Sequence, residues 1–105
     1  MPHFVVDCSE SVLALAEPTE LMQAVFDAAQ ATELFAVEGV FLNVDGHEHF
    51  VHVFANLLEG RSERQKADLF AGVVLALKSL LPAVEILSMN VREFERATYR
   101  NALLV

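Results

Sequence analysis

The sequence has few cysteines and no long apolar segment, and each shortage excludes a class of protein. Cys8 is the single cysteine in 105 residues, so a disulfide-stabilised fold is excluded and a reducing compartment is favoured. The most apolar run, Leu69–Leu77, is far shorter than the roughly 20 residues that cross a bilayer. The N-terminus carries no basic leader. We therefore expect a soluble, cytoplasmic protein with no membrane partner.

Positive charge is missing from the first 60 residues, which hold ten Asp and Glu and no Lys or Arg. Residues 61–105 hold all seven cations against five acids, so the two parts carry −10 and +2 of the net charge of −8. Nucleic acid requires a basic footprint, and we expect no nucleic-acid partner. An anionic small molecule would have to be bound by the second part, in this chain or in a neighbouring copy.

Hydrophobic residues are abundant, at 54% of the chain, which predicts one folded domain over residues 1–105 and excludes intrinsic disorder. Apolar periodicity and helix-start signals predict the elements. They are a strand at about 2–8, a helix from Thr19 as N-cap to about Thr32, strands at Val40–Val44 and His49–Leu58, a helix opened by a Ser62–Gln65 capping box and closed by Pro82, and a strand at Glu85–Phe94. The tail, Thr98–Val105, is expected to be ordered.

The predicted order, β-α-β-β-α-β, indicates an α+β fold made of two tandem β-α-β units, at about 2–44 and 49–94. Such units form a four-stranded sheet with both helices on one face. The helices leave the other sheet face uncovered, so we expect the chain to associate with copies of itself.

Pro2 is the most informative residue for chemistry. A small second residue favours removal of Met1, which would leave Pro2 with a free secondary amine. An α-amino group titrates near 7.7–8.0, and burial or nearby arginines lower that value further. Such an amine is a competent general base or nucleophile at neutral pH. Met-Pro is also a common start with no functional meaning, so Pro2 alone does not identify an enzyme.

Four segments carry a family resemblance: Met-Pro-His-Phe-Val-Val-Asp-Cys-Ser at 1–9, Phe-Val-His-Val at 50–53, Gly-Arg-Ser at 60–62 followed by Arg64-Gln65, and Asn-Ala-Leu at 101–103. The chain resembles the 5-carboxymethyl-2-hydroxymuconate isomerases of the tautomerase superfamily. The resemblance implies a β-α-β-β-α-β fold assembled as a homotrimer with inward-facing sheets, and no cofactor. It also implies isomerisation of a small unsaturated or enol carboxylate, of the kind met in aromatic-compound catabolism.

The same resemblance implies roles for individual residues. Pro2 matches the proline that takes a proton from a dienol and returns it elsewhere. Arg61 matches an arginine that holds a substrate carboxylate, a task suited to its bidentate fork. Arg61 is otherwise a cation beside a helix start, which is mildly unfavourable against the helix dipole, and this gives it a somewhat better claim to a ligand role than an average surface arginine has. Arg64 and His3 are weaker candidates for substrate binding.

The second predicted strand departs from the family pattern. The isomerases carry arginine after the glycine that matches Gly39, whereas this chain reads Val-Phe-Leu-Asn-Val at 40–44. A substrate with several carboxylates would lose an electrostatic anchor there, worth roughly 1.5–3 kcal/mol. A less charged substrate is one reading. The alternative is a non-catalytic oligomer of the same fold that binds a small ligand.

Neither the histidines nor the cysteine predict a second kind of site. His47 and His49 would share one face of a strand with His52 opposite, too few ligands for zinc, and we expect no metal site. His52 matches a family histidine and is expected to be structural. Cys8 has no neighbouring cation in the sequence to lower its pKa, so a nucleophilic thiol is not expected.

Overall fold

The computed structural model describes residues 3–32, 37–46 and 49–95 of the chain. In chain order the elements are β1 (His3–Ser9), a short 3-10 helix η1 (Glu10–Ala14), α1 (Pro18–Gln30), β2 (Gly39–Asp45), β3 (Phe50–Leu58), α2 (Glu63–Leu80) and β4 (Ile86–Phe94). The β-α-β-β-α-β order predicted from the sequence is therefore confirmed. Pro2, His47 and the tail segment Thr98–Val105 lie outside the described residues.

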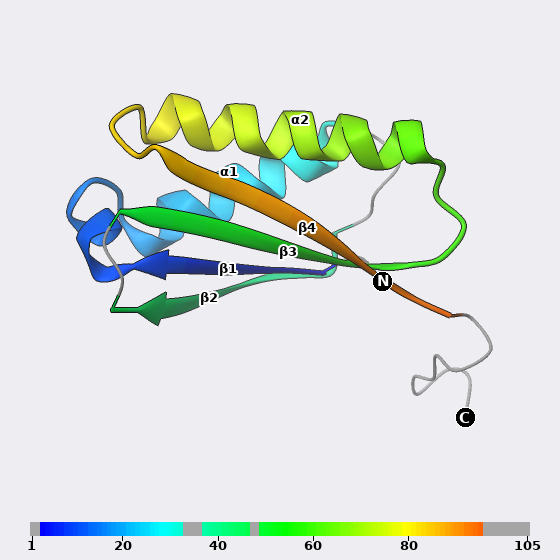
Figure 1. The fold of residues 1–105 in the computed structure, drawn as a ribbon, viewed down its shortest axis with the longest axis horizontal. Coiled ribbons are helices and arrows are strands. Elements are labelled where there is room, and N and C mark those ends of the chain that lie inside the picture. The colour runs from blue at the N-terminus through cyan, green and yellow to red at the C-terminus, as the bar shows by residue number, and fades with distance from the viewer. Residues whose placement is uncertain (1–2, 33–36, 47–48, 96–105) are drawn as a thin grey trace.

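The four strands form one sheet in the order β2-β1-β3-β4. Each β-α-β unit contributes a parallel pair, β1 with β2 and β3 with β4, and the two units meet through the antiparallel pair of β1 and β3. A parallel pair needs a crossover connection, which α1 and α2 supply. Figure 1 shows both helices on the same side of the sheet, as predicted.

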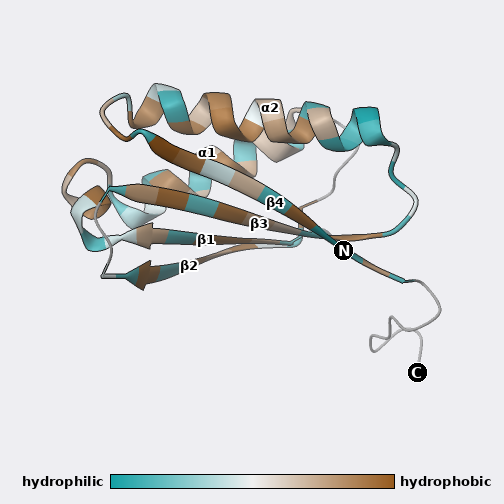
Figure 2. Ribbon diagram, viewed as in Figure 1, coloured by the Kyte–Doolittle hydropathy of each residue, from teal (hydrophilic) through white to brown (hydrophobic). Residues whose placement is uncertain are grey.

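The core lies between the sheet and the two helices. Alternation along β1 directs Phe4, Val6 and Cys8 into this layer, and all three are fully buried. Figure 2 shows hydrophobic and hydrophilic residues alternating along α2, as expected of a helix with one buried face. Further fully buried members come from α1, β3 and α2: Leu21, Val25, Ala29, Val51, Val53, Ala55, Leu57, Leu69, Val73 and Leu77.

The two helix starts test the capping predictions. Ser62 caps α2 as predicted: its Oγ accepts from the Gln65 N–H at 3.1 Å and the Gln65 side chain accepts from the Ser62 N–H. The prediction for α1 was wrong, since Glu17 rather than Thr19 is the N-cap. Pro18 takes the first helical position, which its fixed φ favours, and Glu17 forms the capping box with Glu20.

The strand boundaries differ slightly from those predicted. β3 begins at Phe50 rather than His49, because His49 has a φ of 45°, outside the range of a strand. Its N–H instead donates to Ser11 Oγ at 2.8 Å. β4 begins at Ile86 rather than Glu85. In the described part of the chain, no helix is long and apolar enough to span a bilayer.

Candidate functional site

The topology gathers four strand ends at one end of the sheet. β1 and β2 begin there, and β3 and β4 finish there because β3 runs antiparallel to β1. The register places Gly39, His3, Asn56 and Arg92 side by side in one row across the four strands. We call this row, with the turn that follows β3, the His3 end of the sheet.

A hollow of about 300 Å³ opens at the His3 end, lined by His3, Glu38, Gly39 and Phe41. The His3 ring stands edge-on to the Phe41 ring, with centroids 6.1 Å apart and planes at 82°. Gly39 leaves room for that arrangement, since a Cβ there would lie 3.3 and 3.4 Å from carbons of the Phe41 ring. The hollow thus has an aromatic wall, an imidazole and a carboxylate next to the start of β1.

Arg61 lies in the turn between β3 and α2, at the same end of the sheet. Gly60 takes a φ of 112°, which favours glycine, and turns the chain away from β3. The Glu59 N–H donates to the Phe94 carbonyl at 2.9 Å, tying this turn to the end of β4. Arg61 is half-buried and its Nε is shielded from solvent. Its position is therefore fixed by the strand before it and the helix cap after it.

The remaining candidates occupy different settings. His3 is half-buried and lies on the sheet face opposite Phe4, as strand alternation predicts. Arg64 lies in the first turn of α2 and is exposed. Pro2 directly precedes His3 in the sequence. Arg92 was not among the sequence candidates, although the alternation of Ile86, Ser88 and Asn90 continues to it.

The described histidines do not gather into a metal site. His52 faces the open side of the sheet, where its Nδ1 contacts Ser88 Oγ and its ring meets Phe54 edge-on at 4.4 Å. His49 precedes β3 and is exposed. In residues 3–32, 37–46 and 49–95 there is no group of three His, Cys, Asp or Glu side chains arranged to hold a metal ion.

Cys8 is fully buried in the core beneath the helices. Burial, with a smaller contribution from the Asp7 carboxylate, raises the pKa of its thiol above the usual 9.0. A raised pKa lowers the thiolate fraction at neutral pH, and only the thiolate is nucleophilic. The setting of Cys8 is that of a core residue.

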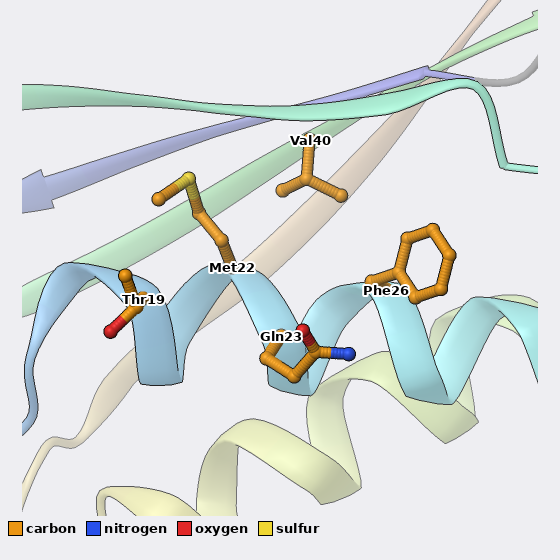
Figure 3. Close-up of a pocket in the computed structure, with 5 residues that line it drawn as sticks. All are labelled: Thr19, Met22, Gln23, Phe26 and Val40. Atoms are coloured by element: carbon orange, nitrogen blue, oxygen red, sulfur yellow. The ribbon is translucent and has the colours of Figure 1, made fainter.

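Two further hollows each lie between a helix and an outer strand of the sheet. One of about 280 Å³ lies between α1 and β2, where Met22 and Phe26 flank Val40, and its polar groups come from Thr19 and Gln23 (Figure 3). It has no charged side chain to hold a carboxylate. The other lies between α2 and β4, where Lys66 is bound by Glu63 at 3.0 Å and Glu93 at 2.8 Å. The His3 end is the better candidate because the turn that carries Arg61 lies there, although the described residues that line its hollow include no Lys or Arg.

Comparison with known proteins identifies the fold. No protein-family model matches the sequence, and no curated protein matches it as a relative. Solved structures do match. Pt0534, inactivated by 2-oxo-3-pentynoate, is 18% identical with a TM-score of 0.81 over 95% of this chain and 91% of its own. A fused 4-OT symmetric trimer is 18% identical with a TM-score of 0.78 over 98% and 94%.

A 5-carboxymethyl-2-hydroxymuconate isomerase from Deinococcus radiodurans R1 is 21% identical with a TM-score of 0.76 over 95% of this chain and 87% of its own. These structures are tautomerase-superfamily members, and their likeness spans nearly the whole of each chain. At such low identity the likeness concerns the fold. The chain has the tautomerase-superfamily fold that its sequence motifs predicted.

Proposed function

We propose that this protein is a cofactor-independent isomerase that tautomerises a small unsaturated or enol carboxylate. Pro2 is the general acid and base, and Arg61 binds the carboxylate. The proposal is supported above all by the topology: β1, which Pro2 precedes in the sequence, begins at the sheet end where the turn carrying Arg61 lies. The structural neighbours, which include named isomerases, support the same reaction class.

The proposed reaction moves one proton and leaves the composition of the substrate unchanged. The Pro2 amine, free once Met1 is removed, takes a proton from the substrate enol. The resulting ammonium returns that proton to a carbon of the conjugated system, which yields the unsaturated ketone. An amine with a pKa near 7.7–8.0 exists in both forms at neutral pH, as both half-steps require. Arg61 holds the carboxylate throughout, so the reacting carbons stay in place.

We further propose a cytoplasmic homotrimer. On the helix-free face, the outer strands expose large apolar side chains: Phe41 at 57%, Ile86 at 60% and Phe94 at 39%. Exposed apolar groups on both outer strands favour association. Several neighbouring structures are described as trimers. Light scattering tests this directly, and a monomer at micromolar concentration would contradict it.

The catalytic proposal is tested in two steps. Intact mass of the protein from cells reports whether Met1 is removed, and a retained Met1 would block the Pro2 amine as an amide. Turnover of phenylenolpyruvate and 2-hydroxymuconate is then compared between wild type and Pro2→Ala. Loss of the general base is expected to lower kcat by about 10²- to 10⁴-fold. Equal rates for the two proteins would remove Pro2 from the mechanism.

The second candidate function is ligand binding without catalysis. It is favoured by the composition of β2, where no residue from Gly39 to Asp45 is a cation. Carboxylate binding by a wild-type protein that turns over neither substrate would support this alternative.

A further inference from the structure

Arg92 occupies the row of the His3 end on the helix-free face of the sheet. It pairs with Asn56 in β3, and Asn56 pairs with His3 in β1. Neighbouring strands are spaced about 4.8 Å apart, so the backbone of Arg92 lies about 10 Å from that of His3. The Arg92 side chain covers part of that distance, since it reaches the ring of Phe54 in β3, whose partner in β1 is Val5. Arg92 therefore lies near the proposed site.

The guanidinium of Arg92 is held against an aromatic surface. Its Cζ lies 4.1 Å from the centroid of the Phe54 ring. Phe54 is in turn braced edge-on by His52, which contacts Ser88. A cation on a ring face gains electrostatic attraction and loses conformational freedom. The Phe54 ring has no lone pair that accepts hydrogen bonds, so the contact leaves the N–H donors of the Arg92 guanidinium available for a planar anion.

Lys66, which packs beside β4, and Arg92, which is part of β4, differ in their charged partners. Lys66 is bound by Glu63 and Glu93 on the helix side of the strand. Arg92 lies on the opposite face and forms no ion pair with the carboxylates of the described residues. Positive charge on the open face at this end of the sheet is consequently not neutralised by those groups. The first unit has no cation at all with which to bind an anion.

We propose that Arg92 binds a second carboxylate of the ligand and so takes the place of the cation that β2 lacks. The proposal rests on the proposed function in that Arg61 binds the first carboxylate. Arg92 is then a specificity residue: it distinguishes a ligand with two carboxylates from an otherwise similar ligand with one.

A matched pair of unreactive ligands tests this independently of catalysis. Trans,trans-muconate and sorbate share the same conjugated six-carbon chain, with two carboxylates and one carboxylate respectively. Calorimetric titration of wild type, Arg92→Gln and the control Lys78→Gln measures Kd for each ligand. We expect Arg92→Gln to weaken muconate binding by about tenfold or more. Sorbate binding should change less than about twofold, and Lys78→Gln should leave both unchanged.

Three outcomes would overturn the proposal. Equal muconate affinity in Arg92→Gln and Lys78→Gln would show that Arg92 holds no carboxylate. Equal weakening of muconate and sorbate would mean that Arg92 does not distinguish them. Loss of the assembly in Arg92→Gln, by light scattering, would assign the residue to a subunit contact. Neither ligand is an enol, so these affinities can be interpreted even if the Pro2 mechanism fails. Recovery of part of the muconate affinity in Arg92→Lys would support the proposed role of Arg92.

Discussion

The two β-α-β units share a topology but differ in charge. The unit made of β1, α1 and β2 carries no cation, whereas the unit made of β3, α2 and β4 carries every described cation. Both contribute a parallel strand pair and a helix to one core. The duplicated architecture therefore serves the fold in both units, whereas the cations that the proposed anion binding requires are confined to the second.

The largest effect on stability is expected in the hydrophobic core, to which both units contribute. Leu21 in α1 and Leu69 in α2 are both fully buried. Leu21→Ala and Leu69→Ala should each lower the free energy of unfolding by about 2–5 kcal/mol, because each leaves a cavity in the same core. Urea denaturation at matched protein concentration measures both. As a control, Leu75→Ala, at a site 61% exposed, should stay within about 0.5 kcal/mol. A cost below 1 kcal/mol in only one unit would break the equivalence.

A second prediction concerns the cations, which only the second unit carries. Arg61→Gln should weaken binding of sorbate and of muconate by about 10- to 100-fold, since it removes a charge-assisted, bidentate contact. Arg61→Lys should retain part of the affinity, because lysine keeps the charge but not the fork. Calorimetry measures both variants, with circular dichroism to confirm folding. Wild-type affinity in folded Arg61→Gln would place the carboxylate elsewhere.

A smaller effect concerns the start of α2, which positions Arg61. Ser62→Ala removes the acceptor for the Gln65 N–H and should cost about 1 kcal/mol of stability. Ser62→Thr keeps a hydroxyl and should cost clearly less. Urea denaturation of the two variants gives the comparison. Identical costs would mean that the hydroxyl does not stabilise the helix start.

The smallest effect is a pH dependence that arises from Lys66 in the second unit. Hydrogen bonds from Lys66 to Glu93 and then Glu63 raise the pKa of the lysine above its usual 10.5. The stabilisation is therefore present below about pH 10.5 and is lost as the pH rises through the raised value. The stabilisation is small because the side chains of both glutamates are solvent-accessible. Thermal melting of wild type and Lys66→Gln between pH 9 and 12 should converge at the alkaline end. A gap that widens with pH would contradict the assignment.

Local patterns were sufficient to predict the fold. Alternation at Phe4, Val6 and Cys8 identified the buried face of β1, and the Ser62–Gln65 spacing located the start of α2. The start of α1 was mispredicted because a glutamate can cap a helix when proline occupies its first position. The 3-10 helix η1 carries no periodicity long enough to be predicted.

The candidate site was only partly predictable. Arg61 is found through a local Gly-Arg-Ser motif, whereas Arg92 joins the His3 end through strand register, a long-range property. The pairing of Asn56 with both His3 and Arg92 follows from tertiary structure. Knowing that β3 lies antiparallel to β1 would have been enough to bring the ends of β3 and β4 to the start of β1.

Binding of the anion by the second unit is tested by the affinity of two charge-matched double variants for trans,trans-muconate. Arg61→Gln/Arg92→Gln and Lys66→Gln/Lys78→Gln remove the same charge from the same unit. We expect Arg61→Gln/Arg92→Gln to weaken binding by about 100-fold or more, because the losses of two separate contacts add. Lys66→Gln/Lys78→Gln should change Kd by less than about threefold, because only long-range attraction is lost. Equal weakening in both would reduce the effect to net charge and contradict a site formed by Arg61 and Arg92.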